Sequence, residues 1–260
     1  MASDKKPFAP RKSIGVNPDK QMSGNKPDGP KRGRQSQPDD GKNATRMMTK
    51  KVKTARGRKL SSKLWIERQI NDPYVREAQI KGYRSRAAFK LEELDDKFGL
   101  LKKNALVVDL GCAPGGWVQI ALKRGAKRVV GIDLLPVETM AGAEMVEMDF
   151  MDEKAPQRLK DMLGRAPDVV LSDLAANTTG HKSTDHLKTV ALVDAAADFA
   201  MDVLASGGSF ATKVFQGGAE EGLLRKLRQN FTLVRHVKPK SSRKGSPEIY
   251  LVATGFKPKD

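Results

Sequence analysis

Two lysines and two carboxylates stand at positions where a proton-transfer site could form. Lys213 lies in a run of apolar residues that predicts a buried strand. An unpaired ammonium group is costly in such surroundings, so Lys213 needs an acidic partner, and Asp173 and Glu248 are the candidates. Lys90 lies in a predicted helix, where it could instead pair with Glu93 one turn further on and stay in water.

A lysine near its reference pKa of about 10.4 is mostly protonated at neutral pH and is a poor base. Burial and a second lysine lower a lysine pKa, whereas nearby carboxylates raise it. Lying close to Lys213, Lys90 would therefore lower the pKa of Lys213, whereas Asp173 and Glu248 would raise it. The sequence leaves that balance open, so Lys213 is either a base or a group that orients an oxygen and takes its proton late.

A glycine-rich loop and two acids follow three successive predicted strands. The first strand runs into Gly111-Cys112-Ala113-Pro114-Gly115-Gly116, where glycines allow a sharp turn and close approach to a ligand. Asp133 ends the second strand and suits a ribose diol, and Asp149 ends the third and can accept from an adenine amino group. Because ligands bind at the carboxyl ends of parallel strands, this order predicts a site for an adenosine-bearing molecule.

The glycine spacing distinguishes two such molecules. A dinucleotide site has the pattern Gly-x-Gly-x-x-Gly, whereas this loop reads Gly-x-x-x-Gly-Gly with Pro114 in the turn. That spacing matches the loop that binds the methyl donor S-adenosylmethionine, and Trp117 would add a flat surface near the ligand. The alternative is a structural strand-to-helix turn surrounded by unrelated surface acids.

Alternating strand and helix signals predict the sheet that positions these residues. We expect an α/β fold with a mostly parallel seven-stranded sheet and helices on both faces. The last two strands are joined by a short basic loop and should form an antiparallel hairpin at one edge. Ser85 is the predicted N-cap of a helix that stops at Gly99. The predicted strands are Ala105–Leu110, Arg128–Leu134, Met145–Phe150, Asp168–Leu174, Ser209–Phe215, Thr232–Val237 and Glu248–Phe256.

Composition divides the 260-residue chain in two. Residues 1–60 carry +12 of the formal net charge of +17. We expect residues 1–58 to be a disordered basic tail and residues 59–260 to be the catalytic domain. The tail either follows a phosphate backbone or serves only solubility. There is no apolar run of membrane-spanning length and only one cysteine, Cys112, which together favour a cytoplasmic protein.

Residues 60–260 resemble the FtsJ/RrmJ family of ribosomal RNA large subunit 2′-O-methyltransferases, which have a Rossmann-like S-adenosylmethionine-dependent methyltransferase fold. The motifs that carry the resemblance keep the family's order along about 200 residues, which makes the match highly specific. They are Ser85–Leu91, Asp109–Trp117, Asp133–Pro136, Asp149-Phe150, Ser172–Ala175, Lys213–Gly217, Ser241–Arg243 and Glu248–Ala253. One departure is Ala176, where many relatives carry proline.

The resemblance implies the roles of individual residues. The catalytic set would be Lys90, Asp173, Lys213 and Glu248, with Lys213 as proton acceptor. Contacts to S-adenosylmethionine would come from Gly115, Trp117, Asp133, Asp149 and Asp173. The implied substrate is a uridine in large-subunit (23S) ribosomal RNA within the assembled 50S subunit. We expect a monomer that needs neither metal nor membrane.

Three alternatives remain: 2′-O-methylation of tRNA, a ribosome-assembly factor that acts mainly by binding, and base methylation. Filled catalytic positions argue against a protein that only binds. Amine-methylating enzymes usually carry Asn/Asp-Pro-Pro-aromatic, whereas this chain has Asp173-Leu174-Ala175-Ala176. Carbon-5 methylation needs a nucleophilic cysteine, and Cys112, within the glycine loop, is better explained as a small packed residue.

Basic residues flank the predicted site on the segments that carry Lys90 and Glu248. We expect them to contact RNA phosphates, which positions the strand without specifying a base. The alternative is a solvated basic surface. These residues are Arg84, Arg86, Lys238, Lys240, Arg243 and Lys244.

Overall fold

The computed structural model describes residues 60–176, 180–215 and 221–258, except the side chains of residues 60, 61, 65, 182 and 183. The predicted basic tail, 1–58, and two residues of a motif, Gln216 and Gly217, lie outside the described residues. All the described residues belong to one compact unit.

Seven strands form one sheet in the order β3-β2-β1-β4-β5-β7-β6. The first five strands are parallel, and β7 lies antiparallel between β5 and β6. This confirms the mostly parallel sheet with an antiparallel hairpin at one edge. The strands are β1 (Leu106–Leu110), β2 (Arg128–Asp133), β3 (Ala143–Glu147), β4 (Val169–Ser172), β5 (Ser209–Phe215), β6 (Phe231–Val237) and β7 (Glu248–Phe256).

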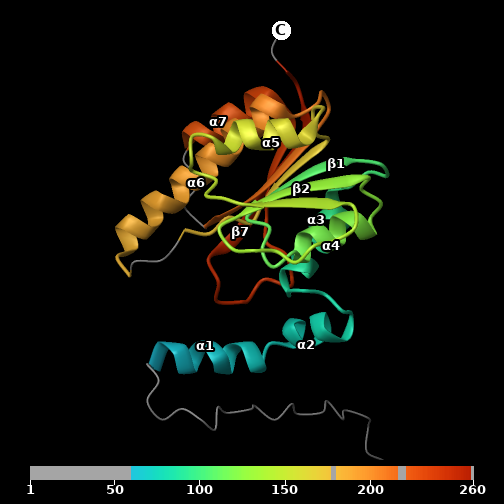
Figure 1. Cartoon of the computed structure of the whole chain (residues 1–260). Helices are drawn as coiled ribbons and strands as arrows, with labels where there is room; N and C mark the ends of the chain where they lie inside the picture. Colours follow the sequence, from blue (N-terminus) through green and yellow to red (C-terminus); the bar gives the residue numbers. More distant parts are fainter. Residues whose placement is uncertain (1–59, 177–179, 216–220, 259–260) are drawn as a thin grey trace, which may run out of the picture. The chain divides into compact units, whose positions relative to one another are not determined.

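Helices cover both faces of the sheet, as Figure 1 shows. One buried cluster joins the sheet to α5, α6 and α7, and a second joins it to α2, α3 and α4. Strands covered on both sides are buried along their whole length, and every residue of β1 is buried, including the acid Asp109. The helices are α1 (Leu60–Ile70), α2 (Pro73–Ile80), α3 (Ala87–Phe98), α4 (Gly116–Lys123), α5 (Ala155–Leu163), α6 (Lys182–Val203) and α7 (Glu221–Asn230).

Three local predictions were wrong. β3 lies two to three residues earlier than predicted, because it pairs with β2 from Val129↔Ala143 to Asp133↔Glu147. β4 ends at Ser172, so Asp173 follows the strand and belongs to the loop. Ser85 does not cap α3: the helix starts at Ala87, and the Ser85 side chain packs instead against Gly116, where an added Cβ would lie 2.3 Å from its Oγ.

Candidate functional site

A cavity of about 620 Å³ lies at the carboxyl ends of β1 to β4, in the position expected for a ligand of a parallel sheet. Its wall includes Gly111 after β1, Asp133 at the end of β2, Asp149 after β3 and Asp173 after β4. Lys188 of α6 contributes to another wall. The cavity thus brings together three carboxylates that the sequence pattern placed at successive strand ends, and its volume suits a nucleoside-sized ligand.

Asp133 holds the glycine loop in place. Its two carboxylate oxygens accept hydrogen bonds from the backbone N–H of Ala113 at 2.8 Å and of Leu135 at 2.9 Å. Each oxygen keeps a second lone pair for a ligand hydroxyl. Gly111 has φ +80°, and a Cβ there would lie 3.0 Å from the backbone of Leu174, so only glycine lets these two loops approach.

The rest of the cavity combines a carboxylate with apolar side chains. Asp149 accepts a hydrogen bond from the backbone N–H of Met151 at 2.9 Å. Apolar residues line the walls near it, and several are exposed to solvent at the mouth. An apolar cleft with a few fixed carboxylates fits an adenosine group, whose base is flat and whose hydroxyl and amino groups donate. The apolar wall residues include Ile132, Leu134, Leu135, Met148, Phe150 and Met151.

Gly115 and Trp117 do not line this cavity. Gly115 has φ +103° at the start of α4, and a Cβ there would lie 2.9 Å from Arg84 Nη1. Trp117 is buried, donates its indole N–H to the carbonyl of Ala87 at 2.8 Å, and packs with its ring centroid 5.7 Å from that of Tyr250. Their ligand contacts remain predictions, and the structure gives both residues a role in joining α4 to neighbouring elements.

Lys213 and Asp173 meet beside the cavity. The buried Lys213 Nζ donates to the backbone carbonyl of Asp173 at 2.7 Å and lies 3.2 Å from its Oδ1. Asp173 therefore belongs both to the cavity, which it lines, and to the ion pair that holds Lys213 in place. The predicted acidic partner of the strand lysine is confirmed.

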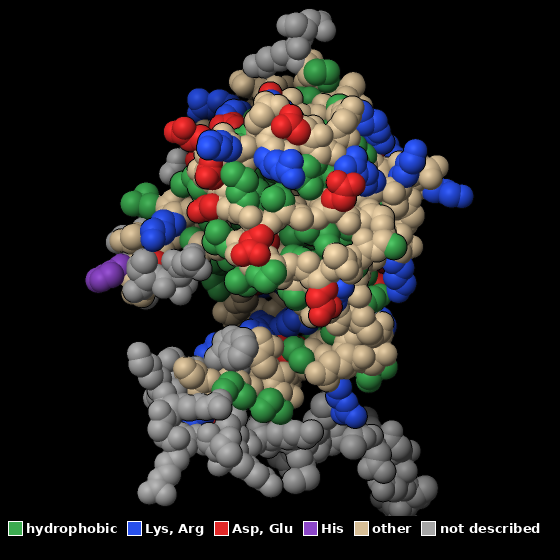
Figure 2. Space-filling view, in the orientation of Figure 1, with side chains coloured by type: hydrophobic (Ala, Val, Ile, Leu, Met, Phe, Trp, Pro, Cys, Tyr) green, Lys and Arg blue, Asp and Glu red, His purple; other side chains and the backbone are tan. Residues whose placement is uncertain are grey.

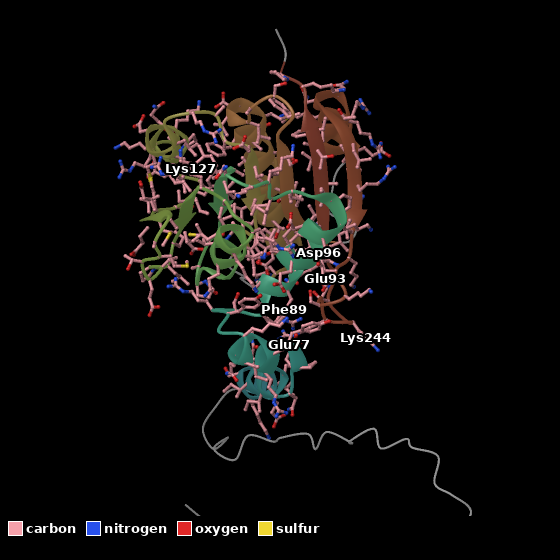
Figure 3. All side chains as sticks on the ribbon, turned by 90° about the vertical axis from the view of Figure 1, so that its right-hand side faces the viewer. Glu77, Phe89, Glu93, Asp96, Lys127 and Lys244 are labelled. Carbon is pink, nitrogen blue, oxygen red and sulfur yellow. The ribbon has the colours of Figure 1, made fainter. Side chains whose placement is uncertain are left out.

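Lys90 and Glu248 form a second pair. Lys90 Nζ donates to Glu248 Oε2 at 3.1 Å, and the lysine is only 8% exposed. The solvated pairing with Glu93 does not occur, because Glu93 accepts the backbone N–H groups of Lys240 and Ser241 at 2.5 and 2.8 Å. Glu93 thus ties the loop between β6 and β7 to α3. In Figure 3 it projects from α3, on the same side as Lys244 of that loop.

Tyr250 connects the two pairs and was missed by the sequence analysis. Its hydroxyl donates to Asp173 Oδ1 at 2.8 Å, and its ring centroid lies 5.5 Å from Lys90 Nζ. Tyr250 is directly opposite Lys213 in the sheet, and Glu248 two residues earlier shares its face. Burial, and secondarily Asp173, raises the pKa of Tyr250 well above its ordinary value, which keeps the hydroxyl protonated as a donor. The period-two spacing from Glu248 was a signal that could have identified it.

Asp109 is a fully buried acid under the glycine loop. Neither carboxylate oxygen has a hydrogen-bond partner among the described residues. Burial, with smaller contributions from Asp173 and Asp133, raises its pKa well above the ordinary value. Asp109 therefore resists ionisation in the folded chain.

Cys112 is buried against Gly131, where an added Cβ would lie 2.8 Å from its Sγ. Burial raises the pKa of the Cys112 thiol, with Asp109 and Asp133 adding to the effect. A nucleophilic cysteine needs a lowered pKa and access, so the packing role expected from the sequence is confirmed.

The flanking arginines make contacts within the chain. Arg84 donates to the carbonyl of Glu138 at 2.8 Å and to that of Pro114, in the glycine loop, at 3.4 Å. Arg86 donates to Asp72 and to the carbonyl of Ser241, while Arg243 Nε donates to Asp72 Oδ2 at 3.0 Å. Asp72 was not identified from the sequence, although an acid directly before Pro73 is a helix N-cap signal, and in the structure it caps α2.

The described part of the chain contains no group of three His, Cys, Asp or Glu side chains that could hold a metal ion. It also contains no helix long and apolar enough to cross a membrane.

Comparison with known proteins places this geometry in one family. A model of the FtsJ-like methyltransferase family matches residues 83–256. The chain is 60% identical over 208 residues to the ribosomal RNA large subunit methyltransferase E of Sphingopyxis alaskensis. That match covers 80% of this chain and 90% of that protein. The protein of the same name from Gluconobacter oxydans is 56% identical over 213 residues, 82% of this chain and 80% of that one.

A solved structure shows the same fold. The crystal structure of a protein described as a ribosomal RNA methyltransferase, from Plasmodium falciparum, is 34% identical and superimposes with a TM-score of 0.61. The match covers 68% of this chain and 100% of that one.

Proposed function

We infer, because this chain belongs to the FtsJ-like methyltransferase family, that it transfers a methyl group from S-adenosylmethionine to a ribose 2′-oxygen of large-subunit ribosomal RNA. The observation that carries the proposal is the position of Asp173, which lines the nucleoside-sized cavity and also holds Lys213. A ligand in the cavity and a substrate at the lysine would therefore meet at Asp173.

The cavity would hold the cofactor through its carboxylates. Asp133 suits the ribose diol and Asp149 the adenine amino group. Gly115 belongs to the glycine loop, and Trp117 directly after the loop donates its indole N–H to Ala87 of α3. Bound there, S-adenosylmethionine would supply a methyl group on a positively charged sulfur. Asp173, close to Lys213, would orient the reacting end.

The lysines and carboxylates would act on the substrate. We assign Lys213 to orient the ribose hydroxyl and, as the free amine, to receive its proton as the oxygen gains the methyl carbon. Lys90 and Glu248 would position the ribose beside it, and the Tyr250 hydroxyl would keep Asp173 in place. Aligning the oxygen with the methyl carbon supplies much of the rate in such a displacement, so fixed side chains matter more than reactive ones.

The names of the relatives, ribosomal RNA large subunit methyltransferase E, favour large-subunit RNA as the substrate class over tRNA. We propose a uridine of 23S RNA within the assembled 50S subunit, modified in the cytoplasm by residues 59–260 acting as a monomer. Labelled S-adenosylmethionine offered with 50S subunits or with free 23S RNA tests this: the subunits should be methylated and the free RNA should not.

The Lys213→Ala variant tests the site. It should bind S-adenosylmethionine with nearly the affinity of the wild type, because Lys213 is not among the residues that line the cavity. Transfer should be abolished. If this variant still transferred the methyl group, Lys213 would not be the proton acceptor. If this variant rescued ribosome assembly, the protein would act mainly by binding.

A further inference from the structure

A second cavity, of about 490 Å³, has the Lys90–Glu248 pair in its wall. Three segments far apart in the sequence form its wall: the end of α1, the beginning of α3, and the loop between β6 and β7. Four of the lining residues are cationic and one is acidic. They are Arg68, Arg86, Lys90, Arg243 and Glu248.

Asp72 joins these segments. It is 8% exposed, caps α2 through the backbone N–H of Tyr74 at 3.1 Å, and accepts from Arg86 and Arg243. Burial lowers the pKa of Arg86, and Asp72 opposes that shift. One carboxylate therefore holds two guanidinium groups in place. Even with Asp72 counted, the cations around the cavity outnumber the carboxylates by four to two.

The remaining positive charge is open to a ligand. Arg68 is exposed in the last turn of α1 and makes no ion pair with any described residue. The Arg243 side chain is 36% exposed, and its buried Nη2 has no hydrogen-bond partner among the described residues. Figure 2 shows Lys and Arg side chains along the hollow above α1. An excess of cations beside a concave surface favours an anion.

We propose that this cavity is a subsite for a phosphodiester of the RNA strand next to the methylated nucleotide. The proposal rests on the proposed function, because a ribose at Lys213 and Lys90 brings its neighbouring phosphates to the Glu248 side of the pair. Arg68 contacts the phosphate directly, and Arg86 and Arg243, fixed by Asp72, form a preformed positive wall. Such a contact positions the strand without reading its sequence.

The Arg68→Gln variant tests the subsite, with Arg76→Gln as its matched control. Arg76 is an exposed arginine of the neighbouring helix α2 and does not line the cavity. The full-length proteins are assayed with 50S subunits from a strain that lacks this methyltransferase. Arg68→Gln should raise KM for the subunits by roughly threefold to tenfold, lower the salt dependence of binding by about one phosphate contact, and leave kcat unchanged.

Arg76→Gln should behave like the wild type, and Arg68→Lys should recover most of the salt dependence, because it keeps the charge. Equal KM and salt dependence for Arg68→Gln and Arg76→Gln would overturn the subsite while methyl transfer persists. Absence of transfer by the wild-type protein would instead refute the proposed function, so the two failures are distinguishable.

Discussion

Replacing Asp72 by asparagine removes one buried charge and little else. Asparagine caps helices about as well as aspartate, so the start of α2 keeps its hydrogen bond. What is lost is the charge that faces Arg86 and Arg243. The side chains of Asp72 and Arg86 are 5% and 14% exposed, so this ion pair is nearly dry.

The size of the effect follows from this burial. Breaking a buried ion pair by removing one partner costs about 3–5 kcal/mol, because the other charge is left uncompensated. The Arg243 pair is half-exposed and adds no more than about 1 kcal/mol. We therefore expect a loss of about 3–6 kcal/mol in the free energy of unfolding. For a domain of this size that corresponds to a Tm lower by roughly 6–24 °C.

Thermal unfolding of the full chain measures it, with Asp96→Asn as the control. Asp96 makes an exposed ion pair with Arg124, so the same substitution there should lower Tm by no more than about 2–4 °C. Adding Arg243→Gln to Asp72→Asn should recover part of the loss, because it removes an uncompensated charge. A Tm for Asp72→Asn equal to that of the wild type, or a drop of the same size in Asp96→Asn, would refute the reasoning.

Three further predictions concern the site. Because burial raises the pKa of Asp109, folding favours its protonated form. Its contribution to stability is therefore complete below its unfolded pKa of about 3.9 and is lost as pH rises toward the raised folded value. Asp109→Asn should melt higher than the wild type at pH 7.5, with the difference shrinking toward pH 4, and a constant difference would contradict this. Cys112 should not react with a thiol reagent in the native protein and should react once per chain after denaturation, and rapid native labelling would show that it is accessible. Tyr250→Phe should lower kcat by about tenfold while RNA affinity stays unchanged. The substitution removes one hydrogen bond to a charged group, worth about 1.5 kcal/mol. An unchanged kcat would show that the Tyr250 hydroxyl does not contribute to catalysis.

The sequence predicted the elements whose signals are local. β5 and β7 have the predicted bounds, because β-branched and aromatic runs end at clear turn residues. β3 was misplaced because its register depends on pairing with β2, and its partly exposed side chains show no strong alternation. Ser85 has the residue type of a cap, but its packing against Gly116 is a tertiary contact that no local rule contains.

In the site, too, some residues could be predicted from the sequence and others depended on contacts that only the fold creates. Asp133, Asp149 and Asp173 were found because topology alone brings the ends of parallel strands together. The partner of Lys90 could not be decided, because Glu93 and Glu248 are both plausible in sequence and only the fold shows which one is near. The paired side chains of Asp72 and Arg243 lie more than 150 positions apart in the sequence, so no spacing between residues could have predicted that they meet.

The central claim is that the methyl group goes to a ribose 2′-oxygen, and alkaline digestion of the labelled RNA tests it most directly. Alkali cleaves RNA through attack by the 2′-hydroxyl on the adjacent phosphate, so a 2′-O-methylated nucleotide resists cleavage. After transfer from labelled S-adenosylmethionine by the wild-type protein, the label should remain in an alkali-resistant dinucleotide. Label recovered in mononucleotides would place the methyl group on a base and contradict the account.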